Sequence, residues 1–169
     1  MKNCGKSTLA LNISKRFKMR LIKIDDLIEK LYFQKKGEKL SFREIHKKYG
    51  ADYFRTLENE ILNNLIGKKI KNSVIDCGGG TVLNESNQLI LKQIGLLTWI
   101  NLDQNINFNR IIKNGIPAFF KYQNDPRKSF DELVKQRFPI YKQLADCILE
   151  LTDEDEERVL NKFIELKII

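Results

Sequence analysis

The first residues of the chain place a glycine, a lysine and a hydroxyl side by side, directly before a stretch with helical periodicity. Gly5-Lys6-Ser7 is the second half of the phosphate-binding pattern G-x-x-x-x-G-K-[ST], and apolar residues recur at helical spacing from Leu9 onward. In such a loop, backbone N–H groups surround the phosphates of a nucleotide, the lysine reaches the outer phosphates, and the hydroxyl binds Mg²⁺. The positive end of the helix that follows also attracts the anion. This stretch therefore predicts a nucleotide site, with a Gly-Lys-Ser that only caps a helix as the alternative.

Composition narrows the class of protein. A length of 169 residues suggests one domain with a single core. No apolar run approaches the roughly 18 residues of a membrane span, and no signal-peptide pattern opens the chain. Three scattered cysteines without a C-x-x-C pair indicate reduced thiols. We therefore expect a cytoplasmic protein that does not associate with a membrane.

The net charge of +8 indicates an anionic ligand. The lysines are spread along the chain, and no block of five basic residues or basic strand with interleaved aromatic residues occurs. This distribution favours a pocket for phosphates and carboxylates over a nucleic-acid surface. A nucleic-acid-binding module remains an alternative that depends on charge alone.

Predicted strands and helices alternate along the chain. Short apolar runs predict buried strands at residues 21–24, 73–77, 96–102 and 148–151. Helical patterns follow at residues 9–17, from 27, 41–46, 51–65, 85–93, 103–113, 130–145 and 154–166, with a break at Gly50. This order predicts a parallel sheet covered by helices on both faces. The polar stretch before the helix at 130–145 is expected to be an irregular loop.

Two predicted strands end in groups suited to ligand binding. Asp25 follows the strand at 21–24, and Gly78, Gly79 and Gly80 follow the strand at 73–77. The carboxyl ends of parallel strands are where open α/β sheets contact ligands, and glycines let backbone N–H groups approach closely. A helix cap for Asp25 and a flexible turn for the glycines are the alternatives.

The order and spacing of its motifs make the chain resemble the shikimate kinase family of P-loop kinases, which are similar to nucleoside-monophosphate kinases. The signatures are residues 3–8, 25–29 (D-x-x-I-E), 50–58 (G-E-x-x-F-R-x-x-E), 77–80 (the GGG turn) and 137–146 (R-x-P-x-Y, then Ala-Asp). The resemblance implies one domain over residues 1–169 with a three-layer α/β/α P-loop kinase fold and a parallel sheet. It also implies a lid-like loop at 113–129.

The resemblance implies an ATP-dependent enzyme that phosphorylates the 3-hydroxyl of shikimate in aromatic amino-acid biosynthesis. Asp25 would hold substrate hydroxyls, Arg55 and Arg137 would clamp the carboxylate, and the Gly78–Gly80 turn would lie against the ring. Glu58 would orient Arg55. This division agrees with chemistry, because guanidinium groups pair with carboxylates through two hydrogen bonds. A carboxylate can accept hydroxyl hydrogens and draw a proton from the attacking one.

Catalysis is assigned by the same match to Lys6 and Asp25, with ATP and Mg²⁺ as cofactors and Ser7 as the metal ligand. The nucleotide-binding residues that the resemblance implies are Asn3, Cys4, Gly5, Lys6, Ser7 and Thr8. Lys6 and Mg²⁺ would offset the charge that grows during transfer, and positioning would supply the rest. We expect a monomer whose ligands are ATP and a small anionic polyol.

The chain departs from the family pattern at three places. Lys23 stands where the family has an acid near the magnesium, and Ile116-Pro117 stands where the family's lid has Arg-Pro. We rank Arg110 and Arg127 first as substitutes for that arginine, ahead of two lysines nearby. The strand that should lead into the phosphate loop is absent, so the first, central strand is missing or truncated. Because unpaired buried backbone groups cost about 1–3 kcal/mol each, we expect the native start to lie upstream.

Two further functions fit the same fold. One is a related P-loop kinase of another polyol acid such as gluconate, which need not use Asp25, Arg55 and Arg137 together. The other is a catalytically weakened, nucleotide-binding or regulatory relative, suggested by Lys23 and Ile116.

Overall fold

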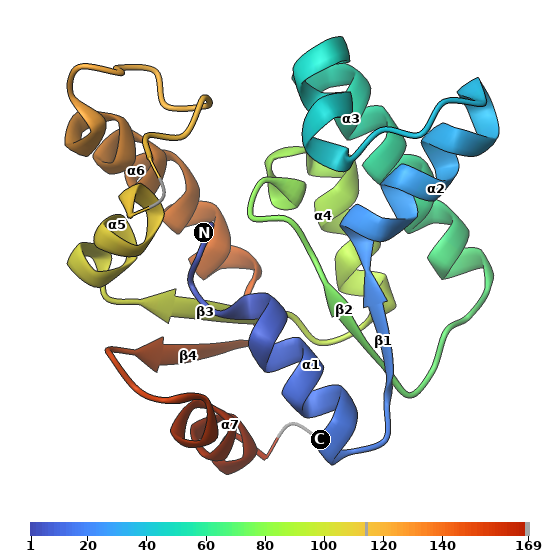
Figure 1. Ribbon diagram of the computed structural model, residues 1–169. Helices are drawn as coiled ribbons and strands as arrows, with labels where there is room; N and C mark the ends of the chain where they lie inside the picture. The colour runs from blue at the N-terminus through green and yellow to red at the C-terminus, as the bar shows by residue number, and fades with distance from the viewer. Residues whose placement is uncertain (114, 168–169) are drawn as a thin grey trace. The chain divides into compact units, whose positions relative to one another are not determined.

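The computed structural model describes residues 1–113 and 115–167, and the chain divides into two compact units (Figure 1). The terminal unit comprises Met1–Asn12 and Leu96–Ile169, and the middle unit comprises Ile13–Gly95. Helix α1 (Lys6–Arg16) begins in the terminal unit. Each unit is described by itself below.

The middle unit is built on a pair of parallel strands. β1 (Arg20–Lys23) pairs with β2 (Ser73–Asp76), and the register places Lys23 beside Asp76 at their carboxyl ends. Helix α3 (Phe42–Gly67) packs against both α2 (Ile24–Lys36) and α4 (Glu85–Ile94). A single 3₁₀ turn, η1 (Thr81–Leu83), connects the glycine turn to α4. Isoleucine, leucine and tyrosine side chains of α2 and α3 form the core of this unit: Ile24, Ile28, Tyr32, Ile45, Leu57 and Leu62.

Local sequence signals set the helix ends in the middle unit. Ser41 and Glu44 form a capping box at the start of α3, which satisfies two backbone donors at once. Gly50 then adopts a φ of 81° and kinks the helix. Residues with a side chain rarely adopt this backbone conformation. The predicted break at Gly50 is therefore confirmed as a kink within one long helix.

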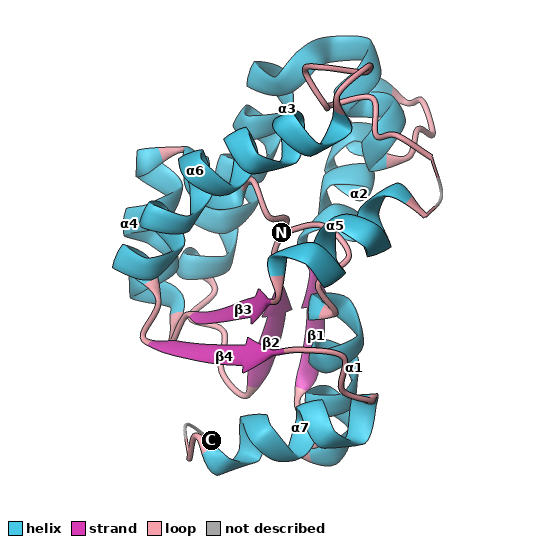
Figure 2. Ribbon diagram, turned by 90° about the vertical axis from the view of Figure 1, so that its left-hand side faces the viewer, coloured by secondary structure: helices cyan, strands magenta, loops and turns pink. Residues whose placement is uncertain are grey.

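The terminal unit also contains one parallel strand pair. β3 (Thr98–Leu102) pairs with β4 (Cys147–Leu151) (Figure 2). Helices α5 (Gln104–Ile112), α6 (Pro126–Leu144) and α7 (Glu156–Glu165) belong to the same unit, and α7 packs on β4. Asp103 caps α5 as predicted, because its side chain accepts hydrogen bonds from two backbone N–H groups of the first turn. Aromatic side chains of β3 and α6 pack together: Trp99, Phe138 and Tyr141.

All four predicted strands are present, and both pairs are parallel. Within residues 1–113 and 115–167, no further strand joins the β1–β2 pair to the β3–β4 pair. These residues therefore form two separate two-stranded sheets. None of the helices in the described part of the chain combines the length and apolar character needed to span a membrane.

Two helix starts differ from the sequence expectation. α2 begins at Ile24 directly after β1, so Asp25 lies in the first helical turn instead of capping a later helix. α6 begins at Pro126, so the last four residues of the loop expected at 113–129 are helical. Asp125 caps this helix and proline occupies its first turn, where its missing N–H costs nothing.

Candidate functional site

In the middle unit, a buried carboxylate holds an arginine at the glycine turn. Arg55 and Glu58 lie one turn apart on α3 and form an ion pair between Nη1 and Oε2. The Glu58 side chain is fully buried, whereas that of Arg55 is 23% exposed. Thr81 Oγ1 donates to the second carboxylate oxygen, Glu58 Oε1, at 2.8 Å. The guanidinium is thus fixed on one side and accessible on the other.

Gly80 makes room for that guanidinium. A Cβ built at Gly80 would lie 2.1 Å from Arg55 Nη2, although the backbone φ of −96° is ordinary. A Cβ at Gly78 would lie 3.3 Å from Thr81 Oγ1. Gly80 and Gly78 therefore allow the close approach of the Arg55 and Thr81 side chains, and the expected contact of this turn with a ligand stays a prediction. The structure brings Arg55, Glu58 and the glycine turn together within one unit.

Asp25 lies in the same unit, in the first turn of α2 and half-buried. The positive end of a helix stabilises a carboxylate there. Lys23 is exposed at the end of β1, with Asp76 as its register partner. Asp25 therefore follows the carboxyl end of a parallel strand, as the sequence predicted.

In the terminal unit, the loop before α1 is tied to α5. Asn107 Nδ2 donates to the Lys2 carbonyl at 2.8 Å, and Asn3 Nδ2 donates to the Arg110 carbonyl at 2.9 Å. Asn3 and Gly5 have φ values of 56° and 90°. Left-handed residues of this kind turn successive N–H groups into a concave anion-binding surface, and the start of α1 adds its unpaired N–H groups.

Lys6 is the first residue of α1, and its ammonium donates to the Met1 carbonyl at 3.4 Å. That acceptor is neutral, so this hydrogen bond leaves the positive charge available to phosphates. Ser7 is exposed beside it, whereas Cys4 is buried with its Sγ donating to the Met1 carbonyl. The residues of the loop therefore fit a nucleotide. In the described part of the chain, no group of three or more His, Cys, Asp or Glu side chains that could hold a metal ion occurs.

Arg137 lies on α6 in the terminal unit and is half-buried. Its Nε is buried without a hydrogen-bond partner among the described residues. Since a buried donor without an acceptor is costly, this N–H is suited to an anionic ligand. Arg55 belongs to the other unit, so the two-arginine clamp stays a prediction.

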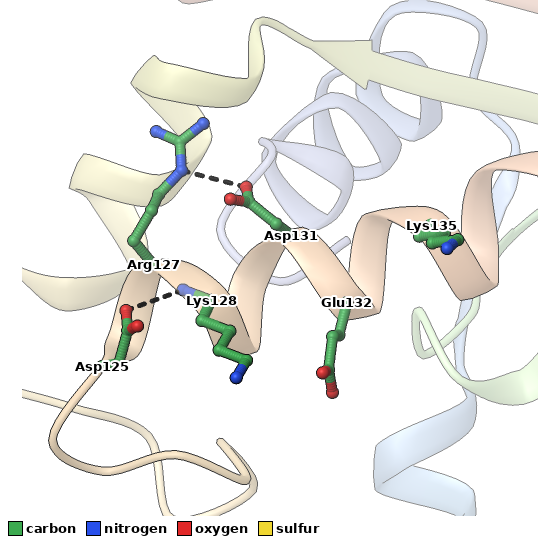
Figure 3. Close-up of a pocket in the computed structure, with 6 residues that line it drawn as sticks. All are labelled: Asp125, Arg127, Lys128, Asp131, Glu132 and Lys135. Carbon is green, nitrogen blue, oxygen red and sulfur yellow. Dashed lines mark hydrogen bonds and ion pairs between the residues drawn. The ribbon is translucent and has the colours of Figure 1, made fainter.

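The two arginines ranked as substitutes for the lid arginine already have protein partners. Arg110 pairs with Asp153 at 2.9 Å. Arg127 pairs with Asp131 at 2.9 Å (Figure 3) and donates to Asn105 Oδ1 at 2.8 Å. Exposed pairs of this kind contribute at most about 1 kcal/mol, so either arginine could exchange its aspartate for a phosphate.

An open hollow of about 450 Å³ lies along the start of α6, and Figure 3 shows the side chains that line it, Arg127 among them. Three acidic and three basic side chains line this hollow: Asp125, Arg127, Lys128, Asp131, Glu132 and Lys135. The acidic and basic side chains are equal in number, so the net charge of the hollow does not favour an anion.

The expected lid-like loop includes residue 114, which lies outside the described residues. From residue 115 to the start of α6 the loop folds on itself. Gln123 Nε2 donates to the Phe120 carbonyl at 2.7 Å, and Tyr122 N donates to Ser129 Oγ at 2.8 Å. Phe120 is buried, whereas Ile116 and Phe119 are exposed. The lid-like role of this loop stays a prediction.

Comparison with known families places the whole chain. The family model for shikimate kinase matches residues 2–167. The chain belongs to the shikimate kinase family. A shikimate kinase of Clostridium botulinum (strain 657 / Type Ba4) is 38% identical over 151 residues, which are 89% of this chain and 84% of that relative. One from Caldanaerobacter subterraneus subsp. tengcongensis is 30% identical over 167 residues, covering 96% and 92%.

Solved shikimate kinases have the same fold. The enzyme from Acinetobacter baumannii in complex with shikimate has a TM-score of 0.81 at 23% identity, covering 97% of this chain and 87% of that one. The enzyme from Aquifex aeolicus has a TM-score of 0.71 at 26% identity, covering 98% and 90%. The predicted P-loop kinase fold and the predicted membership of the shikimate kinase family are thereby confirmed.

Sequence reasoning missed three buried polar residues that hold the candidate site residues in place: Thr81, Asn87 and Asn107. The two asparagines stand at buried positions of amphipathic helices. An amide at a position where the helical pattern calls for an apolar residue is the signal that could have found them.

Proposed function

We propose that this protein transfers the γ-phosphoryl group of ATP to the 3-hydroxyl of shikimate, forming shikimate 3-phosphate and ADP. The observation that carries the proposal is the Arg55 guanidinium, which Glu58 fixes against Gly80 and which remains partly exposed. In a member of the shikimate kinase family, this is a group prepared for a small carboxylate. We expect the protein to act as a monomer in the cytoplasm.

The acid substrate would be held by its carboxylate and its hydroxyls. Arg55 offers a planar pair of donors, and planar donors match a carboxylate two hydrogen bonds at a time. Arg137 offers a buried N–H that has no partner in the described residues. Asp25 would accept hydroxyl hydrogens and draw the proton from the attacking 3-hydroxyl as the phosphoryl group arrives.

The nucleotide would bind at the start of α1. The N–H groups around Asn3 and Gly5 would hold the phosphates, and Lys6 would contact the outer ones. Bound Mg²⁺, with the Ser7 hydroxyl as its protein ligand, would neutralise phosphate charge. Phosphoryl transfer depends mainly on positioning and electrostatic stabilisation, so these groups need no covalent step.

A nucleotide-binding relative with weakened catalysis is the second candidate. Ile116 is an exposed apolar residue at the family's lid arginine position, and Arg110 and Arg127 already pair with aspartates. This candidate predicts ATP binding without turnover.

A coupled ADP-release assay separates the two functions. We expect ADP release that depends on shikimate and that gluconate does not support at the same concentration. Nucleotide binding is measured in parallel by calorimetry. ATP binding with no acid-dependent ADP release would favour the weakened relative, and release with gluconate alone would indicate a different polyol kinase.

A further inference from the structure

We propose that Thr81 is a positioning residue for the acid substrate, whose hydroxyl keeps Glu58 oriented so that Glu58 holds Arg55 against the glycine turn. The inference rests on the proposed function, because Arg55 is the proposed carboxylate-binding group. Thr81 itself would not contact the substrate.

The Glu58 carboxylate has one side-chain partner on each oxygen. Oε2 accepts from Arg55 Nη1, and Oε1 accepts from Thr81 Oγ1 at 2.8 Å. Glu58 and Thr81 are both 0% exposed, so water does not replace a lost partner easily. A carboxylate held at both oxygens cannot turn without breaking one bond. The Thr81 hydroxyl therefore fixes the plane in which Glu58 meets Arg55.

Thr81 is itself held on both sides of its backbone. Its N–H donates to the Gly78 carbonyl at 3.1 Å. Its carbonyl accepts from Asn87 Nδ2 at 3.0 Å, and Asn87 is also 0% exposed. Asn59 Nδ2 then donates to Asn87 Oδ1 at 2.9 Å. The position of the hydroxyl is thus set by α4 as well as by the glycine turn.

These three hydrogen bonds form a ring that the α3 backbone between Glu58 and Asn59 closes. It runs from Glu58 through Thr81 and Asn87 to Asn59, which is the residue next to Glu58 on α3. Closed, fully satisfied polar networks hold their members more rigidly than separate pairs do. Through Glu58, the ring fixes Arg55 before substrate arrives, and a side chain that is already ordered loses less entropy on binding.

The test compares valine and serine at position 81. Thr81→Val keeps the shape of the side chain and removes the hydroxyl, whereas Thr81→Ser keeps the hydroxyl. We expect Thr81→Val to raise the KM for shikimate about tenfold, the scale of one hydrogen bond to a charged group. The KM of Thr81→Ser for shikimate should stay within about twofold of the parent value, a range that corresponds to a small fraction of such a bond. The KM for ATP and kcat should stay within the same range in both variants.

Thr56→Val is the matched control. Thr56 lies on the same helix, is exposed, and its hydroxyl donates to the Asp52 carbonyl, so the KM of this variant for shikimate should not change. A Thr81→Val protein with an unchanged KM, or a serine variant as impaired as the valine variant, would overturn the proposal. If the valine variant does not fold, Thr81→Cys replaces it. The weak thiol donor should then give an intermediate KM, and a KM equal to that of the parent protein would count against the role.

A second readout does not depend on turnover. In ¹⁵N NMR spectra, the Arg55 guanidinium should give separate, slowly exchanging Nη signals in the parent protein and in Thr81→Ser. It should give averaged signals in Thr81→Val. If the parent protein does not phosphorylate shikimate, the proposed function fails, yet these spectra still test the positioning role. Averaged signals in the parent protein would overturn it.

Discussion

Lys6→Ala is expected to lower kcat by about a hundredfold to a thousandfold, the cost of removing one donor placed where charge develops in a transition state. Lys6 opens α1 beside a loop with two left-handed residues, and its ammonium bonds a neutral carbonyl. Its charge is therefore directed to phosphates that gain negative charge during transfer. The measurement is kcat at saturating ATP and shikimate in the coupled ADP-release assay.

Lys15→Ala is the control for this change. Lys15 lies in the last turn of the same helix and is exposed, so its loss removes one positive charge without touching the loop. Both variants should melt within a few degrees of the parent protein, since neither lysine is buried. A Lys6→Ala enzyme that retains a third or more of the parent kcat would remove Lys6 from the proposed nucleotide site.

The fold could be predicted wherever a signal was local. Short apolar runs between polar stretches identified the four strands, and Gly50 identified the kink in α3. The start of α6 was missed because Pro126 and Arg127 lie in a polar stretch. Asp125 followed by proline is nevertheless a typical helix start, with a cap and a pre-set φ.

The site could be predicted only in part. The resemblance implied that Glu58 orients Arg55, and their spacing of three residues on one helix lets the two side chains meet. The partnership of Glu58 with Thr81 depends on how η1 returns the chain to α3, and no local pattern encodes that return. The hydrogen bonds from Asn107 to Lys2 and from Asn3 to Arg110 each join residues more than 100 positions apart in the sequence. Sequence periodicity cannot predict such contacts.

Gly80→Ala should displace Arg55 and weaken the binding of shikimate. The new Cβ would lie 2.1 Å from Arg55 Nη2, so the guanidinium must move. The backbone at Gly80 has an ordinary φ of −96°, and the group that moves is the end of a flexible side chain. That group is also the ion-pair partner of the fully buried Glu58, and straining a buried ion pair destabilises the fold. We therefore expect a melting temperature below that of the parent protein.

The displaced guanidinium would lose its aligned approach to the substrate carboxylate. Hydrogen bonds to charged groups contribute about 1.5–3 kcal/mol each, so the KM for shikimate should rise about tenfold to a hundredfold while the KM for ATP stays constant. Gly67→Ala is the matched control, because a Cβ there meets nothing within 4 Å. If Gly80→Ala keeps the parent KM for shikimate, Arg55 does not bind the acid from the place that this structure gives it. If instead both Michaelis constants rise together, the turn serves the active site as a whole and the carboxylate assignment of Arg55 fails.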